Sequence, residues 1–483
     1  MRQFAISVNM TQLIKKMKNS FIKIKKGSAL TYALILTSIV SVILLGIVQF
    51  VISHVNFGLK TAAREQSLHI AEAGVYFYRW YLAHQVEGKT SQQIQNFWQN
   101  ENPYGVNTPL VADYEGIGSY SITVTPPPPN STIVIVQVTG STYIHPEMQR
   151  TVQVRFRRPS WSEFAVLADA DIRFGDGTEI FGPLHSNGGV RFDGVAHNIV
   201  SSLVEDYVDP DTGITRPGVW TSWSGEYNSN MGSSVFLAGK EFPSGEQDFN
   251  GVTADLALMK DEAINGNGIY FNNTGQGRHI VLRTDGTADV RTVNSYNTTS
   301  NSITSESGVT NHAFPDGGVI YVEDNIWLEG QVDGRRVTIV AADLVGGASP
   351  NIFIENDITY SNYDGTDVIG IIGEGDVEII RDSEDDLRID GAMLAQNGRV
   401  GREHYGSYCT AWWWIFCTNW ETDNKDTITV FGSIATLQRY GFAWTDGTGY
   451  TDRNLLYDNN LLYYPPPYFP TGTKYAIDLW EEL

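Results

Sequence analysis

The hydrophobic pattern of this chain begins with one long uncharged run near the N-terminus. Residues 28–57 contain no Lys, Arg, Asp or Glu, and most positions from Ala33 to Ile52 are apolar. About 20 consecutive apolar residues in a helix suffice to span a bilayer. The run therefore predicts a membrane-spanning helix. Its far end, residues 52–57 (ISHVNF), lacks the small-residue cleavage site that is typical of a secretory signal peptide.

The next segment, residues 58–85, has the pattern of an amphipathic helix. Its apolar residues recur every three or four positions, and it contains no Pro. The pattern predicts that the membrane helix continues without a break, so that residues 28–85 form one rod of about 85 Å. A rod with one apolar and one amphipathic half suits a filament subunit. It also suits a stalk that lifts a domain off a membrane.

The residues before the apolar run are basic and end in a glycine. Residues 1–27 include Arg2 and six lysines, and Gly27 stands directly before Ser28. Such an excess of positive charge places this end in the cytoplasm and predicts that the rest of the chain is exported. A basic leader, a Gly and an apolar helix are together what a prepilin peptidase reads. The alternatives are a plain membrane anchor and a secretory signal.

Residues 65–74 (EQSLHIAEAG) carry a family resemblance. They resemble the A-L-x-A-A-E-A-G segment that ends the N-terminal helix of PilX-type minor pilins, with Ala71, Glu72, Ala73 and Gly74 as matching positions. The K-type tip pseudopilins of type II secretion have a similar N-terminal organisation.

The resemblance implies that residues 1–27 are a leader, cut by a prepilin peptidase after Gly27, with Ser28 as the methylated first residue of the mature chain. It implies a minor pilin that acts in priming or at the tip of a type IV pilus or a related filament. Its partners would be other minor and major pilins. It would cross the cytoplasmic membrane once, with an exported head, and later reach the pilus or cell surface.

One position departs from the pattern of major pilins. Those have Glu at the fifth mature position, where it meets the N-terminal amine of a neighbouring subunit, and here that position is Tyr32. The difference favours a minor, initiating or tip subunit over a bulk subunit. Small residues allow helices to pack closely in a membrane or filament core, and the run offers Ala29, Ala33, Ser38, Ser41 and Gly46.

Residues 86–158 have the pattern of a small β module. Thr90 to Asn100 predicts a short helix. Three runs that alternate apolar and polar residues then predict strands with one buried face, over residues 118–124, 132–138 and 150–156. A long helix followed by a small antiparallel sheet is the pilin arrangement.

Residues 159–483 have a different pattern, in which short strands recur between single Gly, Asn, Asp or Glu corners. This predicts a parallel β-solenoid head, with a β-sandwich as the alternative. Residues 201–315 interrupt the strands with a helical stretch, 254–263, and with residues 294–311, which we expect to be an exposed loop. The C-terminal segment 455–483 is expected to lie along the head and seal its last coil.

Composition and two cysteines add further expectations. The 55 acidic and 33 basic residues give a formal net charge of −22, which argues against nucleic acid as a partner. Cys409 and Cys417 are eight residues apart in an exported domain and predict a small disulfide loop. The loop contains Trp412, Trp413 and Trp414, which form an exposed interaction patch if it projects, or cover an open end of the core if it folds back.

The search for chemistry in the head leads to no catalytic residues, no metal and no cofactor. His185 and Ser186 lack a positioned third group for a triad. Residues 209–213 and 382–386 have carboxylates at calcium-like spacing, but neither matches the EF-hand loop. We therefore expect no enzyme. The alternative is a membrane-anchored surface solenoid that binds or cleaves polysaccharide, with a surface glycan as the partner.

Overall fold

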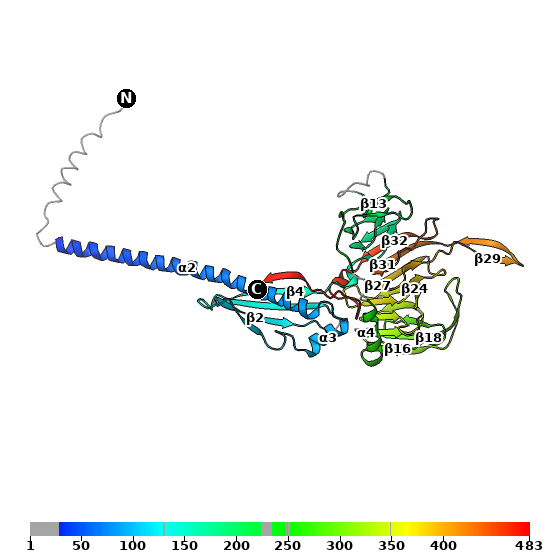
Figure 1. Ribbon diagram of the computed structural model, residues 1–483, viewed down its shortest axis with the longest axis horizontal. Helices are drawn as coiled ribbons and strands as arrows, with labels where there is room; N and C mark the ends of the chain where they lie inside the picture. The colour runs from blue at the N-terminus through cyan, green and yellow to red at the C-terminus, as the bar shows by residue number, and fades with distance from the viewer. Residues whose placement is uncertain (1–28, 129–130, 224–233, 248, 250–251, 348) are drawn as a thin grey trace, which may run out of the picture. The chain divides into compact units, whose positions relative to one another are not determined.

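The structure is a computed structural model that describes residues 29–483, except residues 129–130, 224–233, 248, 250–251 and 348 (Figure 1). Density of internal contacts divides the chain into two compact units. One comprises the described residues up to Glu72 with Ala112–Tyr120 and Thr139–Thr151, and the other comprises the described residues of Ala73–Val111, Ser121–Val138 and Val152–Leu483. The division therefore falls within the long helix and within the small sheet.

Helix α2 (Ala29–Val86) is a single helix of 58 residues, and it ends one residue beyond the predicted Gln85. All residues from 29 to 62 are exposed. From Ala63 onward one face of the helix is buried, and its apolar residues are Ala63, Ile70, Ala71, Val75, Tyr78, Leu82 and Val86. Among the described helices, α2 alone is long and apolar enough to cross a membrane, by length and composition.

The small sheet has five strands in the order β1-β2-β3-β4-β33. The three predicted runs form β2, β3 and β4, whose connections are short enough to make consecutive strands antiparallel. The buried residues alternate along each of them, as a sheet with one covered face requires. The bounds are β1 Leu110–Tyr114, β2 Gly118–Thr125, β3 Ile133–Thr142, β4 Arg150–Arg157 and β33 Ala476–Glu482. The predicted short helix is α3 (Ser91–Asn100), which begins with a capping box of Thr90 and Gln93.

Most strands of the head form three stacks of parallel strands, so the fold is mainly β with a parallel solenoid and not a sandwich. The first stack runs through β16 (Gly268–Phe271), β21 (Gly318–Val322), β23 (Arg336–Ala341), β25 (Val368–Gly373), β27 (Asp386–Ala395), β31 (Asn424–Thr436), β5 (Val166–Ala168), β8 (Leu184–Ser186), β11 (Val200–Ser202) and β15 (Lys240–Glu241).

The other two stacks lie beside the first and enclose one apolar core. The second stack contains β17 (Arg278–Leu282), β22 (Ile326–Val332), β24 (Ile352–Tyr360), β26 (Val377–Ile379) and β28 (Val400–Arg402), with β6 (Ile172–Phe174), β9 (Val190–Phe192) and β14 (Val219–Trp220) as a separate sheet. The third contains parts of β22, β24, β27 and β31, then β32 (Gly449–Tyr457), β7 (Thr178–Phe181) and β10 (Val195–Ala196).

The order of the stack differs from the order of the chain. Strand β5, the first of the head, pairs with β31, near the C-terminus. The coils that begin at β5 and end at β15 therefore extend the stack in one direction from β31. The remaining coils start at β16 and wind back toward β31. The last coil of the chain consequently has neighbours on both sides and needs no cap.

Residues 455–483 lie along the head in part, but the prediction that they seal its last coil is wrong. The Pro-rich part of this segment lies along the outside of the first stack, where Thr338 Oγ1 donates to the Pro467 carbonyl at 2.5 Å and Arg336 Nη2 to the Pro465 carbonyl at 2.6 Å. Its last strand, β33, then pairs antiparallel with β4 of the small sheet. The partner strand lies more than 300 residues earlier, so no local pattern indicates this pairing.

A helix and two short helical segments cover the outer side of the first stack. Helix α4 (Val252–Asn265) buries Met259 and Ala263 on the first stack. Leu461 of the short helix η3 (Asn459–Leu462) and Trp161 of η1 (Trp161–Glu163) are buried in the same cluster. This cover explains why β21, β23 and β25 are buried on both faces.

Residues 294–311 do not form the exposed loop that we expected. They contribute to antiparallel strands β18 (Thr287–Tyr296), β19 (Ile303–Glu306) and β20 (Thr310–Ala313). Val293 packs with Trp327 and Phe353 of the second stack. Polar Ser, Thr and Asn residues are compatible with a strand whose outer face is solvated, so their abundance misled the interpretation. A separate antiparallel pair is formed by β12 (Asp206–Val208) and β13 (Thr215–Pro217).

A close approach of backbone to backbone fixes helix α2 on strand β3. A Cβ atom built on Gly140 would lie 2.6 Å from the amide nitrogen of Ala71 and closer still to the carbonyl oxygen of Ser67. No side chain fits there without separating the helix from the strand. The position therefore requires Gly, and Ala71 of the AEAG segment is small for the same reason.

We predict that Gly140→Val destabilises the protein, because the added methyl groups meet backbone atoms that cannot rotate away. The expected loss in the free energy of unfolding is about 2–3 kcal/mol, measured by thermal unfolding in detergent micelles. Gly58→Ala is the matched control, since a Cβ there meets no described atom within 4 Å. An unchanged melting temperature for Gly140→Val would contradict the close contact.

Candidate functional site

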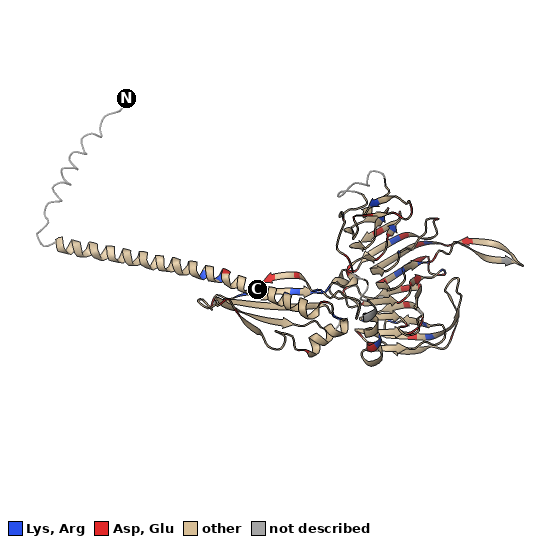
Figure 2. Ribbon diagram, in the orientation of Figure 1, with Lys and Arg blue, Asp and Glu red and all other residues tan. Residues whose placement is uncertain are grey.

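The exposed half of α2 presents a long, continuous apolar surface. Figure 2 shows no charged residue on this part of the helix, and the first charge is Lys60. Two of its hydroxyl groups bond back to the helix, since Thr37 donates to the Ala33 carbonyl at 2.9 Å and Ser38 to the Ile35 carbonyl at 2.8 Å. A continuous helix also satisfies its own backbone groups, as a segment in hydrocarbon requires.

The predicted filament residues all lie on this exposed half. Tyr32 is 67% exposed. The small residues Ala29, Ala33, Ser38 and Gly46 are also exposed. The predicted processing residues, Gly27 and Ser28, lie outside the described residues.

The residues of the AEAG segment take up different positions on the helix. Ala71 and Gly74 are buried, whereas Glu72 and Ala73 are partly exposed. Glu72 Oε2 lies 3.1 Å from Nδ1 of His69 on the same helix face. The apolar members of the motif thus have a packing role, and the carboxylate is at the edge of the contact.

The two cysteines lie in a β-hairpin that projects from the head (Figure 1). Its strands are β29 (Ser407–Trp413) and β30 (Phe416–Thr422), which pair antiparallel. Cys409 and Cys417 form a disulfide across the hairpin, with Cα atoms 5.8 Å apart. Trp414 and Ile415 form the turn between the strands.

The hairpin does not fold back onto the core. Trp413 is 72% exposed, Trp414 87%, Ile415 71% and Phe416 60%. Trp412 lies in β29 beside them. The predicted patch is therefore present at Trp413 and Trp414, and Ile415 and Phe416 extend it.

The polar residues that we considered for catalysis or calcium have structural partners. His185 Nδ1 lies 3.0 Å from Ser201 Oγ, while Ser186 Oγ donates instead to the Ala170 carbonyl at 2.6 Å. Asp209 accepts hydrogen bonds from its own turn, including one of 2.7 Å from Thr212 Oγ1. Within the described part of the chain, no group of three His, Cys, Asp or Glu side chains is placed to hold a metal ion.

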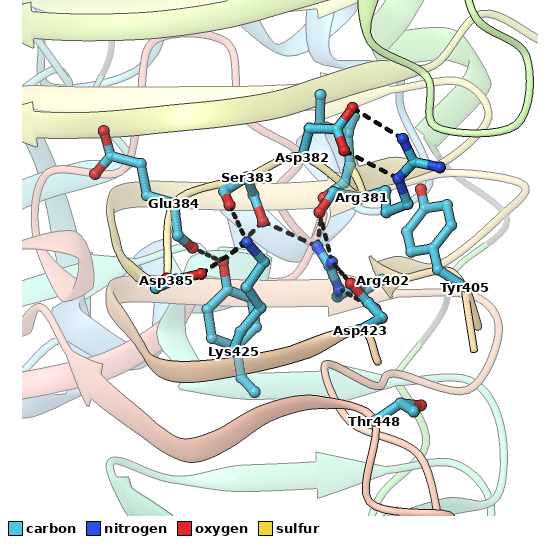
Figure 3. Close-up of polar contacts among 12 residues, drawn as sticks. Arg381, Asp382, Ser383, Glu384, Asp385, Arg402, Tyr405, Asp423, Lys425 and Thr448 are labelled. Atoms are coloured by element: carbon cyan, nitrogen blue, oxygen red, sulfur yellow. Dashed lines mark hydrogen bonds and ion pairs between the residues drawn. The ribbon is translucent and has the colours of Figure 1, made fainter. Parts of the chain in front are cut away.

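The acidic run 382–386 lies at the exposed edge of a polar network whose centre is buried (Figure 3). Asp382 pairs with Arg381 at 2.9 Å, and Asp385 accepts from Lys425 Nζ at 2.8 Å. At the centre, Arg402 and Asp423 form a fully buried ion pair, with Nε of Arg402 3.2 Å from Asp423 Oδ2. Arg402 also donates to the carbonyls of Ile380 and Arg381 and, at 2.9 Å, to Ser383 Oγ.

Sequence reasoning missed this buried pair. Arg402 comes from the second stack, whereas Asp423 precedes β31, and 21 positions separate them. Neither residue is part of a motif. The only local signal is that Arg402 follows an apolar strand residue, Val400, with the spacing of an inward-facing position.

Glu378 is the buried carboxyl group with the most perturbed environment near the hairpin. Burial raises its pKa to about 7. Tyr405 Oη donates to it at 2.6 Å and Asn301 Nδ2 at 3.1 Å, and both hydrogen bonds oppose the rise. Because the residue is only 6% exposed, a saccharide has no approach to this carboxyl group. Glu378 therefore adds no support to the cleavage alternative.

The arrangement defines a class of protein: a membrane-length apolar helix, a small antiparallel sheet packed on its second half, and a parallel β-solenoid head. This is a pilin-like helix and sheet with a β-solenoid added.

Comparison with known proteins adds little to this class. No family model and no curated protein matches the chain. Among solved structures, the competence-associated pilin ComZ from Thermus thermophilus aligns with 87% of this chain and 98% of its own, at 13% identity and a TM-score of 0.30. A TM-score of 0.30 establishes neither a shared fold nor a shared function.

We predict that Asp423→Ala strongly destabilises the head, because Arg402 would keep its charge in a buried site without a counter-ion. The expected loss is about 3–5 kcal/mol in the free energy of unfolding. Asp382→Ala is the matched control, since its ion pair with Arg381 is partly exposed and is expected to contribute at most about 1 kcal/mol. Denaturant unfolding of the two variants measures the difference, and equal losses would refute this role for the buried pair.

Proposed function

We propose that this protein is a PilX-like minor pilin of a type IV pilus or a related filament. It is inserted by α2 into the cytoplasmic membrane with the N-terminus in the cytoplasm, exports its head, and acts in priming or at the tip of the filament. The observation that carries the proposal is the structure of α2. Its first half is exposed and uncharged as far as Leu59, and it continues without a break into a half that packs on a small antiparallel sheet.

The physical argument concerns what can cover this helix. Residues 29–62 expose apolar side chains that water solvates poorly. A bilayer covers them before assembly, and neighbouring helices of the same kind cover them in a filament core. Exposed small residues such as Ala33 and Gly46 support packing in a filament core, because they let helix backbones approach closely.

Tyr32 supports a special position in the filament. If the mature chain begins at Ser28, its fifth residue is a phenol and not a carboxylate. A phenol forms no ion pair with the N-terminal amine of the next subunit. A subunit without this registration contact suits initiation or the tip, where one of the two neighbours is absent.

The proposal gives the head no enzymatic activity, metal or cofactor. The alternative, a membrane-anchored solenoid that binds or cleaves a polysaccharide, remains a prediction of the sequence. Binding of a surface glycan by the head is compatible with a minor pilin, because tip subunits also act as adhesins.

The proposed function makes a prediction about processing of the N-terminus. Mass spectrometry of the mature N-terminus should find Ser28, N-methylated, in cells that contain a prepilin peptidase, and an intact leader in cells without it. Gly27→Val should block the cut, because the enzyme reads the residue before the bond. An intact leader in the presence of the peptidase would make α2 a static anchor and refute the proposal.

The proposed function also makes a prediction about assembly into filaments. Gly46→Leu should leave insertion and folding unchanged, because a Cβ at this position meets no described atom within 4 Å. It should reduce incorporation into filaments severalfold, since a large side chain holds neighbouring helices apart. Immunogold counts on sheared filaments measure this. The matched control is Gly308→Leu in the head, which is equally unobstructed, and equal incorporation of both variants would count against helix packing at Gly46.

A further inference from the structure

The hairpin β29–β30 carries an apolar tip that the proposed function does not use. We propose that this tip, Trp413 to Phe416, inserts into the headgroup region of a zwitterionic lipid bilayer. The head would then make a second membrane contact, separate from α2. The inference does not rest on the minor-pilin proposal, because it concerns the head alone.

Exposure of the tip on every side is the first argument. Trp413 and Phe416 are directly opposite each other on the two strands, and Trp414 and Ile415 form the turn beyond them. All four side chains are at least 60% exposed. A partner protein with a flat apolar face would cover one side of such a hairpin. A bilayer surrounds an inserted tip and covers all of it.

The absence of charge near the tip of the hairpin favours a zwitterionic lipid over an anionic one. Residues 407–420 contain no charged side chain, and the first charge on β30 is Glu421. No Lys or Arg on the hairpin is present to attract anionic headgroups, which basic segments recognise. The acidic chain as a whole, with a net charge of −22, is repelled by them. A zwitterionic surface accepts an uncharged tip and places its ammonium groups near Glu421.

The backbone of the hairpin suits the hydrated headgroup region and not the hydrocarbon. Its strands pair antiparallel, so the amide and carbonyl groups that face the partner strand are paired, while those on the two outer edges remain open to water and headgroups. Two hydroxyl groups also bond inside the hairpin, since Thr418 Oγ1 donates to the Ala411 carbonyl at 3.0 Å and Thr410 Oγ1 to the Asn419 carbonyl at 3.4 Å. The disulfide between Cys409 and Cys417 holds the strands together near the tip, so little conformational entropy is lost on insertion.

The residue types fit the interface between lipid and water and not a sugar site. Trp is enriched at membrane interfaces, where its ring is buried and its indole N–H reaches water or a headgroup. A glycan site needs polar side chains beside an aromatic ring to bind hydroxyl groups. Within Trp413 to Phe416 only the indole N–H groups are polar, and Ile415 presents no ring for stacking.

The test uses the full chain held by α2 in nanodiscs of ordinary phosphatidylcholine. These are mixed with phosphatidylcholine vesicles that carry brominated acyl chains, which quench Trp fluorescence on contact. We expect quenching and co-flotation with the vesicles. The double variant Trp413→Ser/Trp414→Ser should lose about tenfold or more of the vesicle-bound fraction, because two large apolar rings are removed.

The controls separate the tip from other effects. Val345→Ser removes an equally exposed apolar side chain of the head, 86% exposed, and should bind like the parent. Cys409→Ser/Cys417→Ser should weaken binding severalfold while circular dichroism shows a folded head. Empty nanodiscs should cause no quenching.

Three results would overturn the inference. One is equal vesicle binding by the double Trp variant and the parent. Another is binding to anionic vesicles alone. The third is no vesicle binding, with capture of the parent on immobilised glycans or on a purified pilin that the double Trp variant loses, since the tip would then be a glycan or protein contact.

Discussion

The head depends on the double pairing of strand β31. On one side it pairs with β27 in parallel over ten successive positions, from Asp386↔Thr427 to Ala395↔Thr436. On the other side it pairs with β32 and with β5, the first strand of the head. Parallel strands need partners at both edges to satisfy their backbone groups. β31 is thus where segments from both ends of the head join into one stack.

This order explains the remaining architecture. Because the last coil lies inside the stack, the C-terminal segment is free to cover the outer side of the first stack and to reach β4 through β33. Helix α4 covers the same stack, and β18 and β19 cover the second. Among the described residues, none covers the tip of the hairpin β29–β30, where Trp413 and Trp414 stay exposed.

The helix obeys a different constraint. Its second half is held on the sheet at Gly140, where backbone meets backbone, whereas its first half is exposed at every position. The same helix thus has one surface suited to its own sheet and one suited to lipid or to other helices. Membrane insertion and assembly are therefore compatible with a head that folds without help from residues 29–62.

The sequence by itself determined the elements whose signal is local. The apolar and amphipathic halves of α2, the alternating strands β2 to β4, the short solenoid strands and the cysteine spacing all follow from residue type and period. Only the tertiary structure decided the stack order, the place of β33, the pairing of Arg402 with Asp423 and the exposure of Trp413 and Trp414. Each of these depends on contacts between residues far apart in the chain, or on the absence of such contacts. Periodicity records which face of an element is buried, but it does not record which distant segment buries it.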